Sequence, residues 1–493
     1  MSLPVRRLPT LVARAAAIAL GLVAALATAQ PYTTPPPPAA PRPLAIAAPS
    51  EMKLANGLRL IVARREGIPL VSAELVALAG AEADPQRLSG LASLSAALMT
   101  QGTRRRSAPE LAAAAETLGG SLDSGAGWNQ SLVSMTVTTP KLDAAVALVA
   151  EVVREPVFAP DEIERVRTQT LDSLKVAYAS PGTLAGLVAE RLAYGAGAYG
   201  HPASGTPDSL PRIARDDLVA AHRRAFRPDH AVLILAGDIT PESGLALARR
   251  HFGSWAAPGE PAPTPTPPVA APARSGPAVA IVDMPKSGQA GVVVALPLPE
   301  RSGSERAIGA VLNSVLGGGY SSRLNQEVRI KRGLSYGASS TLDARREAAL
   351  FRVAVQTKNE SAAEVVGLVQ AEIDRLMKEP IPGDELAARK LALIGGFSRS
   401  VETTAGLAAA IRTLVVANRS PAELKERIGQ LESVSAADIQ RYAAANLGSA
   451  KRRLAVAGEA STFGAALKAS EPGLVTVGQD ALDLERSDGL SRR

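Results

Sequence analysis

A repeated pattern is the feature that most restricts how this chain of 493 residues can fold. The run AVLILAGDIT around Gly237 matches the run RRLAVAGEAS around Gly458. In each matched pair the second copy follows about 220 residues after the first, and two copies are too few for a solenoid. The sequence therefore predicts two homologous domains arranged as a pseudo-symmetric pair. The other matched patterns are Asp161-Glu162-Ile163 with Asp384-Glu385-Leu386, and Asp217-Leu218 with Asp438-Ile439.

Proline-rich tracts separate the predicted parts of the chain. Pro31 to Pro43 and Pro258 to Pro277 are rich in proline, which lacks a backbone N–H and favours extended spacers. The second tract divides the remainder into nearly equal halves and indicates an interdomain linker. The predicted parts are a signal peptide (1–29), a proline-rich spacer (30–48), an N-terminal domain (49–257), a linker (258–277), a C-terminal domain (278–470) and a disordered polar tail (471–493).

The N-terminus has the features of a secretory signal. Arginines at positions 6, 7 and 14 surround the start of an apolar run from Ala15 to Ala27, and Ala27-Thr28-Ala29 provides a small-x-small cleavage site. The apolar run is shorter than the roughly 20 residues that span a membrane. We therefore expect export to the periplasm, with an uncleaved membrane anchor as the alternative. The chain has no cysteine, which excludes disulfide bonds and a thioether lipid anchor.

Hydrophobic periodicity predicts a mixture of strands and helices. A capping box at Ser107 to Glu110 opens a helix that Gly119-Gly120 ends. Strands do not alternate with single helices, so the pattern favours the α+β class, with each domain a mostly antiparallel sheet that has helices packed on one face. The remaining predicted elements are strands at 58–62, 69–79, 131–139 and 231–236, and helices at 91–99, at 142–153 and from 161 onward.

The charge distribution argues against a nucleic-acid partner. The formal net charge is +7, and three of those positive charges lie in the predicted signal peptide. Basic residues do not form a stripe with interleaved aromatic residues, which nucleic-acid-binding chains commonly show. We therefore expect no nucleic acid among the partners.

Several segments together resemble the insulinase/pitrilysin-type (inverzincin) zinc metallopeptidases, in particular two-domain bacterial and processing-peptidase-like members. The resemblance covers about Met52 to Ala460. It implies a clam-like half-chamber built from two domains. The segments that carry it are NGLRLIVARREGIPLVSAELVALAGAEAD, GLASLSAALMTQGT, YGHPASGTPDSL, AFRPDHAVLILAGDIT and LNSVLGGGYSSRLNQEVRIKRGLSYGASS.

The zinc motif of that family is degenerate in this chain. The family's zinc helix carries H-x-x-E-H, in which two histidines bind the metal and the glutamate is the general base. Ser93 and Ala97 stand at the histidine positions and Ala96 stands at the glutamate position. Near the place of the third ligand only Asp172 offers a carboxylate, and catalytic zinc normally has three protein ligands. We therefore expect no metal in this chain.

The four histidines of the chain lie far downstream of the degenerate motif. Their spacing does not rebuild a metal site. We expect a structural role for His201 and a surface position for His222, on the helix that carries it. The other two histidines are His230 and His251.

A second motif of the family is intact. In the family, an Arg and a Tyr seven residues apart complete the active site across the substrate cleft, and the resemblance places them at Arg329 and Tyr336. A tyrosine hydroxyl and a cation can stabilise the negative charge that develops on the carbonyl oxygen during peptide hydrolysis. The alternative is that Arg329 lies on a helix surface and Tyr336 packs on a strand.

The combination of a lost metal site and a retained Arg/Tyr pair predicts a division of labour. The chain is expected to be the non-zinc-binding subunit of a heterodimeric periplasmic zinc metallopeptidase. It would supply Arg329 and Tyr336 in trans to a homologous partner that carries zinc and H-x-x-E-H. The expected substrate is an unfolded or short peptide, bound by strand addition to a sheet edge. A non-catalytic scaffold or peptide-binding protein of the same fold is the alternative, and a stand-alone peptidase has little support.

Overall fold

The computed structural model describes residues 47–259, 277–299, 303–346, 348–486 and 490. The described residues fall within one compact unit, Ala45–Arg493. The predicted signal peptide lies outside the described residues, and so do most of the spacer and most of the linker. None of the helices in the described ranges combines the length and the apolar composition that crossing a membrane requires.

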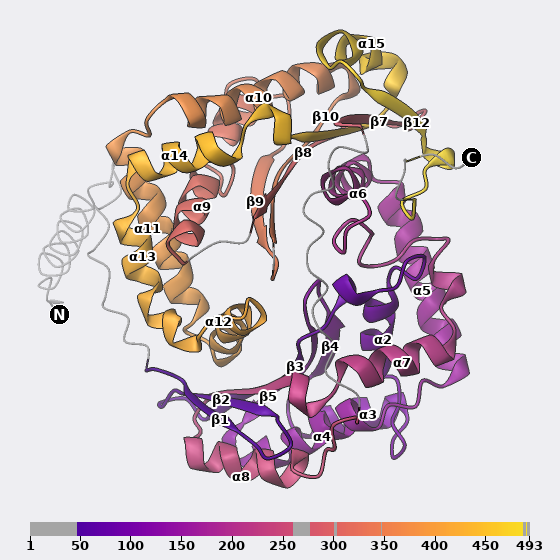
Figure 1. The fold of residues 1–493 in the computed structure, drawn as a ribbon, viewed down its shortest axis with the longest axis vertical. Coiled ribbons are helices and arrows are strands. Elements are labelled where there is room, and N and C mark those ends of the chain that lie inside the picture. Colours follow the sequence, from indigo (N-terminus) through magenta and orange to yellow (C-terminus); the bar gives the residue numbers. More distant parts are fainter. Residues whose placement is uncertain (1–46, 260–276, 300–302, 347, 487–489, 491–493) are drawn as a thin grey trace, which may run out of the picture. The chain divides into compact units, whose positions relative to one another are not determined.

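The first half of the chain builds a mixed six-stranded sheet with the order β1-β2-β6-β3-β5-β4 (Figure 1). Strand β6 pairs in parallel with β2, and the other neighbours pair antiparallel. The strands are β1 (Ser50–Lys53), β2 (Arg59–Arg64), β3 (Leu70–Ala77), β4 (Leu122–Ala126), β5 (Ser131–Thr138) and β6 (Ala231–Gly237). The α+β class and the mostly antiparallel pairing are confirmed.

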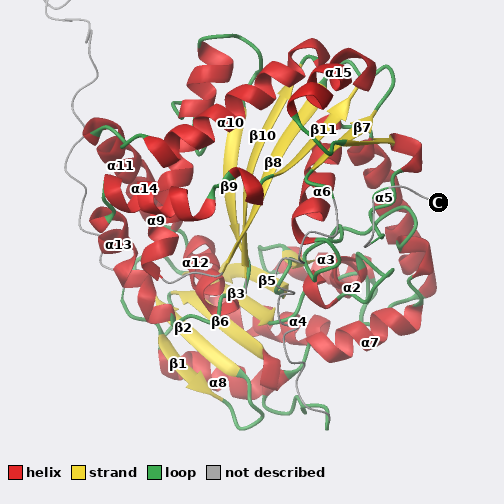
Figure 2. Cartoon of the chain, turned by 45° about the horizontal axis from the view of Figure 1, so that its top comes forward, coloured by secondary structure: helices red, strands yellow, loops and turns green. Residues whose placement is uncertain are grey.

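The second half builds another six-stranded sheet with the order β12-β7-β11-β8-β10-β9 (Figure 2). Its strands are β7 (Val279–Asp283), β8 (Ala290–Pro299), β9 (Ala338–Ala344), β10 (Ala348–Thr357), β11 (Arg453–Gly458) and β12 (Val475–Gly478). Strands β7 and β11 pair in parallel, as β2 and β6 do in the first sheet. The two sheets differ at one edge, where β1 is antiparallel to β2 but β12 is parallel to β7.

The matched sequence patterns occupy equivalent places in the two halves. Gly237 ends β6 with φ 136°, and Gly458 ends β11 with φ 156°. A Cβ atom on Gly237 would lie 2.1 Å from the carbonyl oxygen of Leu70, so a close strand approach requires glycine there. Asp217 and Asp438 occupy the same capping-box position of helices α7 (Arg215–Ala225) and α14 (Ala436–Asn446). The equivalence supports an internal duplication.

Each sheet has one face covered by helices of its own half. Helices α4 (Leu142–Arg154) and α8 (Pro241–Phe252) pack on the first sheet. Helices α10 (Ala362–Lys378) and α15 (Ala460–Ser470) pack on the second sheet. The remaining long helices are α2 (Leu91–Met99), α3 (Ala108–Thr117), α5 (Pro160–Tyr178), α6 (Pro181–Tyr194), α9 (Gly303–Leu316), α11 (Gly383–Ser400), α12 (Thr404–Val416) and α13 (Arg427–Ser433).

The opposite face of each sheet is covered by a helix from the other half. Helix α6 packs its apolar side, including Leu184 and Val188, on β8 and β11 of the second sheet. Helix α12 packs on β3 and β6 of the first sheet, on the side away from α8 (Figure 1). Because β6 is covered on both faces, all of its residues are buried, and its sequence is a continuous apolar run. Each half thus contributes one helix, α6 or α12, to the sheet of the other half, and we call this arrangement the helix exchange.

The chain after Glu471 is not disordered throughout, so the prediction of a disordered tail is wrong for its described part. Strand β12 extends the second sheet, and Leu482 and Leu484 are buried against it. The carboxylate of Glu485 accepts a hydrogen bond of 2.6 Å from Ser89 Oγ in the first half. The polar composition of this segment did not predict a strand, because the four residues of β12 form a strand only by pairing with the edge of the second sheet at β7.

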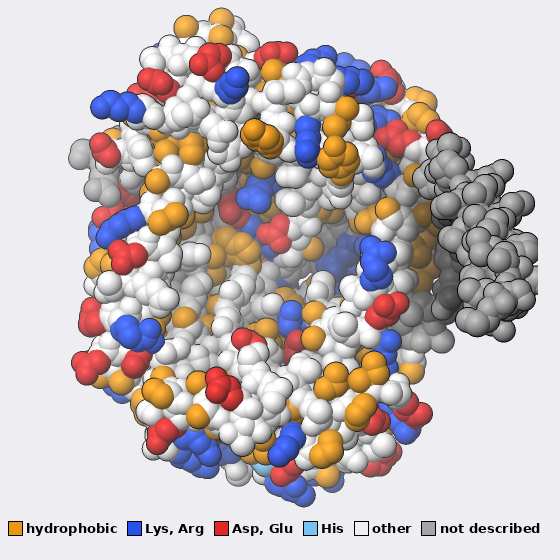
Figure 3. All heavy atoms as spheres, turned by 180° about the vertical axis from the view of Figure 1, so that it is seen from behind, with side chains coloured by type: hydrophobic (Ala, Val, Ile, Leu, Met, Phe, Trp, Pro, Cys, Tyr) orange, Lys and Arg blue, Asp and Glu red, His pale blue; other side chains and the backbone are white. Residues whose placement is uncertain are grey.

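The surface carries charges of both signs. On the face drawn in Figure 3, basic and acidic side chains are interspersed, and side chains of both signs are visible inside a central hollow.

Candidate functional site

Helix α2 carries the degenerate metal motif, and a buried carboxylate holds its N-terminus. Asp84 accepts backbone hydrogen bonds from Gly90 and Ala92, both 2.9 Å long. Burial raises the pKa of the Asp84 carboxyl to about 7, although the two N–H donors oppose the shift. Asp84 therefore fixes where α2 begins and is a buried titratable group of the site.

The three motif positions on α2 are packed into the protein. Ser93 donates a 2.7 Å hydrogen bond to the carbonyl oxygen of Ala203, and Ala96 is 1% exposed. Ser124 Oγ on β4 donates to the carbonyl oxygen of Ala96 at 2.8 Å. Together with the half-buried Ala97, these residues offer one hydroxyl and two methyl groups, which do not fit a zinc ion.

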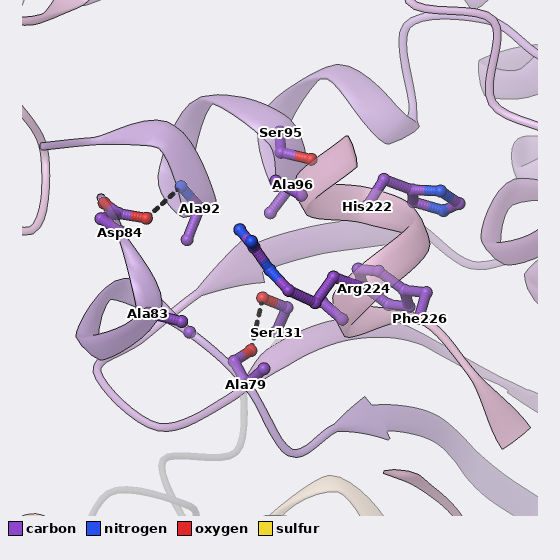
Figure 4. A pocket seen from close by; sticks show the side chains of 13 residues that line it. Ala79, Ala83, Asp84, Ala92, Ser95, Ala96, Ser131, His222, Arg224 and Phe226 are labelled. Carbon is purple, nitrogen blue, oxygen red and sulfur yellow. Dashed lines mark hydrogen bonds between the residues drawn. The ribbon is translucent and has the colours of Figure 1, made fainter. Parts of the chain in front are cut away.

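A cavity of about 40 Å³ lies beside α2, bordered by Ala92, Ser95 and Ala96. Helix α7 forms another part of its wall, and Figure 4 shows the side chain of Arg224 extending into the pocket toward α2. The cavity has room for water only. A guanidinium in this position opposes the binding of a cation.

The predicted third position also lacks a ligand role. Asp172 on α5 pairs with Lys175 at 2.8 Å, and its side chain is 62% exposed. No cluster of three or more His, Asp or Glu side chains suited to a metal ion occurs within the described ranges. The residues present do not fit zinc.

The histidines have structural partners. His222 is half-buried, and its Nε2 lies 2.9 Å from the carbonyl oxygen of Val153. Burial lowers the pKa of His222 to about 4. The ring of His201 packs edge-on to Trp128, and burial lowers its pKa to about 4 as well. Helix α7 packs on α2, and the ring of His222 stacks on Phe226, so His222 is only partly at the surface.

Arg329 lies in a π-helical segment, Asn325–Ile330, of the second half. Its guanidinium stacks over the ring of Tyr320, 4.8 Å from the ring centroid. Tyr336 follows in the loop before β9, and its side chain is 91% exposed. The alternative of a packed strand aromatic is therefore wrong for Tyr336. No hydrogen bond joins the Arg329 and Tyr336 side chains, both of which belong to the described residues.

A network of hydrogen bonds positions this segment against β9. Asn325 Nδ2 donates to the Gly319 carbonyl at 3.1 Å, and Asn325 Oδ1 accepts from the Ala338 backbone N–H at 3.0 Å. A Cβ atom on Gly317 would lie 2.3 Å from the Ser340 nitrogen, so the turn can approach the edge strand only with glycine. The glycine run is thus a close-packed turn at a sheet edge.

Three groups beside the site escaped the sequence reasoning. Arg224 is close to the motif residues only through the fold, and Tyr320 lies in the segment of Arg329 but nothing in the sequence indicated that the two side chains stack. Asp84 gave no local signal either, because it lies six residues before Gly90, the N-cap residue of α2.

Comparisons with known proteins identify the family. The family model described as Insulinase (Peptidase family M16) matches residues 60–198, and the Peptidase M16 inactive domain matches residues 212–393. An uncharacterized zinc protease of Streptomyces coelicolor is 25% identical over 397 residues, which cover 80% of this chain and 86% of that protein. A Helicobacter pylori protein named a non-peptidase homolog is 24% identical and covers 66% of this chain and 74% of its own length.

A solved structure agrees with these sequence matches. The crystal structure of a peptidase M16 inactive domain from Pseudomonas fluorescens superposes with a TM-score of 0.77 and 26% identity, covering 84% of this chain and 98% of that one. The two family models together span more than half of the present sequence. The chain therefore belongs to the insulinase family of peptidases, family M16, and it lacks the family's active zinc motif.

Proposed function

We propose that this chain is the non-zinc-binding subunit of a two-chain periplasmic peptidase. In this proposal Arg329 and Tyr336 bind the substrate and stabilise the developing oxyanion. A homologous partner supplies zinc and the general base. The observation that carries the proposal is the 91% exposure of Tyr336. A large aromatic side chain without packing contacts is available to a substrate or to another chain.

The residues at the degenerate zinc motif also support a division of catalytic roles between two chains. Helix α2 keeps its place and its Asp84 cap, while the metal positions hold Ser93 and Ala97. Hydrolysis of a peptide bond then requires a metal from elsewhere. The zinc protease names of relatives favour a peptidase context for the fold.

Peptide binding would use a sheet edge beside the motif. Strand β4 is an edge strand of the first sheet, and its Ser124 contacts α2 directly. An extended peptide that adds to such an edge gains backbone hydrogen bonds with little dependence on its sequence.

The test combines the purified chain with an H-x-x-E-H homologue from the same genome and follows hydrolysis of a fluorogenic peptide. We expect activity only in the mixture, and we expect a chelator to abolish it. Arg329→Ala and Tyr336→Phe should each lower kcat by about 100-fold, as loss of an oxyanion donor does. Arg332→Ala is the matched control, because Arg332 lies on the same segment but pairs with Glu327. Full activity of both site variants would refute the proposal.

A non-catalytic scaffold or peptide-binding role is the second candidate. The non-peptidase name of the Helicobacter pylori relative favours it. In that case the chain binds extended peptides equally well with and without Tyr336→Phe, and no zinc-bearing homologue gives activity. Peptide affinity measured by fluorescence anisotropy therefore separates the two candidates.

A further inference from the structure

A pocket of about 380 Å³ lies among α9, α11, α12, α13 and the end of β9, in the second half of the chain. Its volume lies in the range of small-molecule sites, roughly 300–1,000 Å³. We call it the arginine pocket, after the side chains that distinguish it. These are Arg306, Arg419 and Arg427, next to the apolar Leu342, Leu393 and Phe397.

The cations of the arginine pocket are not balanced by its own anions. Glu423 is the one carboxylate among the described lining residues, and Arg419 donates to it at 2.7 Å. Arg306 has interactions of its own. The half-buried guanidinium of Arg427 forms no hydrogen bond or ion pair with any residue that the structure describes.

The environment of Arg427 is costly for the folded protein. Burial lowers the pKa of Arg427, and the positive charge of Arg306 lowers it further. A partly buried charge without a partner destabilises a protein, and sequences retain such groups where function needs them. The guanidinium fork binds an oxyanion through two parallel hydrogen bonds.

The other residues that line the arginine pocket indicate which kind of molecule carries the bound anion. Leu342, Leu393 and Phe397 are half-buried and border the open volume, so an apolar body placed there removes apolar surface from water. One unpaired cation beside an apolar wall matches a ligand with one negative charge.

We propose that the arginine pocket binds a small molecule with a single carboxylate on an apolar body. Arg427 binds the carboxylate, and Leu342, Leu393 and Phe397 contact the apolar part. A fatty acid of medium length and the carboxyl end of a short apolar peptide share this chemistry. The site is separate from the Arg329 and Tyr336 segment and does not depend on the function proposed above.

Isothermal titration calorimetry of the full chain at pH 7.5 tests the site with sodium decanoate below its micelle concentration. We expect one site per chain and much weaker binding of 1-decanol, which has the same chain without the charge. Arg427→Gln should weaken decanoate binding by about 10- to 100-fold, the range for loss of a charged hydrogen bond. Arg64→Gln is the matched control, because Arg64 is 50% exposed and pairs with Glu66.

A second arm identifies the source of the carboxylate. An apolar tetrapeptide with a free carboxyl end is compared with its carboxamide. Binding of the free acid but not of the amide indicates a peptide, and binding of decanoate alone indicates a fatty acid. Both results support the site if Arg427→Gln abolishes them. The proposal is overturned if neither carboxylate binds, or if decanoate binds wild type and Arg427→Gln equally.

Thermal unfolding without ligand tests whether Arg427 instead has a structural role, because a structural role would change the Tm. A ligand-binding Arg427 predicts that Arg427→Gln leaves the Tm unchanged or raises it, because an unpaired charge is removed. A clear drop in Tm contradicts the proposal. Phe397→Ala provides a second test, since it should weaken decanoate binding about tenfold while Arg427 stays in place.

Discussion

Arg412 on α12 donates a 2.5 Å hydrogen bond to Glu74 Oε2 on β3, so an ion pair joins the second half of the chain to an inner strand of the first sheet. Glu74 is 5% exposed. Burial raises the pKa of Glu74, and the charge of Arg412 opposes that rise. Helix α12 thus covers a buried carboxylate on the sheet and also pairs it with a positive charge.

Removal of Arg412 should be costly. Arg412→Met leaves Glu74 buried without its partner, and we expect a loss of about 3–5 kcal/mol in the free energy of unfolding. A buried carboxyl with a raised pKa makes the folded protein less stable as the pH rises, because the carboxyl must then ionise in the interior. The destabilisation by Arg412→Met should therefore be larger at pH 8 than at pH 5. Urea denaturation at both pH values measures it. The exposed pair of Arg59 and Glu51 is the control, and Arg59→Met should cost less than about 1 kcal/mol.

The exchange of α6 and α12 predicts that the two halves stay together after the linker is cut. A protease site inserted between residues 260 and 276 should yield two fragments that co-elute in size-exclusion chromatography and unfold in one transition. Val188→Asp on α6 should break this association, because it places a charge in the apolar contact with the second sheet. Separate elution of the cleaved wild-type fragments would show that the exchanged helices contribute little.

Asp84 predicts a pH dependence of stability. Its pKa is raised from 3.8 to about 7, so the folded state binds a proton more tightly than the unfolded state does. Stability from this group is full below about pH 4 and is lost as pH rises toward 7. The Asp84→Asn variant has no carboxyl to ionise at this position. Its free energy of unfolding relative to wild type should therefore increase by a few kcal/mol between pH 4 and pH 7.5. Guanidinium denaturation at pH 4, 5.5 and 7.5 measures the difference, and a constant difference contradicts the raised pKa.

Restoration of the motif alone should not restore a metal site. Ser93→His, Ala96→Glu and Ala97→His place three larger side chains on α2, where Ala96 is 1% exposed. Overpacking should cost about 1–3 kcal/mol, and Asp172 remains paired with Lys175. We expect clearly less than one zinc per chain in elemental analysis of the triple variant. A stoichiometric content would mean that α2 and α5 rearrange readily.

Arg345 is a further link between the halves. It lies in the turn after β9, and its guanidinium stacks over the rings of Trp128, Tyr194 and Tyr199, with centroid distances of 4.4, 4.8 and 4.9 Å. It also pairs with Glu190. Arg345→Lys keeps the charge but loses the planar stack, so we expect a loss of about 2 kcal/mol. Thermal unfolding beside the surface variant Arg64→Lys measures it, and equal Tm values for both would contradict a role of the rings.

Local patterns predicted the individual elements well. The helix predicted at 91–99 has the bounds of α2, and the capping box at Ser107 opens α3. Strands β2, β3, β5 and β6 lie where alternating or continuous apolar runs predicted them. These features depend on neighbours in sequence, such as a cap or a periodic apolar face. The duplication was equally visible, because it compares the chain with itself.

Features that depend on distant residues could not be predicted. The apolar side of α6 gave no indication that it covers the second sheet. The polar segment around β12 becomes ordered only because β7 offers an unpaired edge. His222 is half-buried because α7 packs against α2. For the candidate site, the motif located Arg329 and Tyr336 in sequence, but the stacking of Arg329 on Tyr320 depends on the turn at Gly317.

The helix exchange also sets an order of events during synthesis. Strand β6 ends at Gly237, but α12, which covers the second face of its sheet, ends only at Val416. At ribosomal speeds of roughly 5–20 residues per second, this face stays uncovered for roughly 10 to 40 s after β6 has been made. During this interval the nascent first half leaves one face of β3 and β6 uncovered by α12, and we expect this face to contact other chains unless a chaperone covers it. A gene truncated between the copies would therefore encode an aggregating fragment and not a smaller working protein.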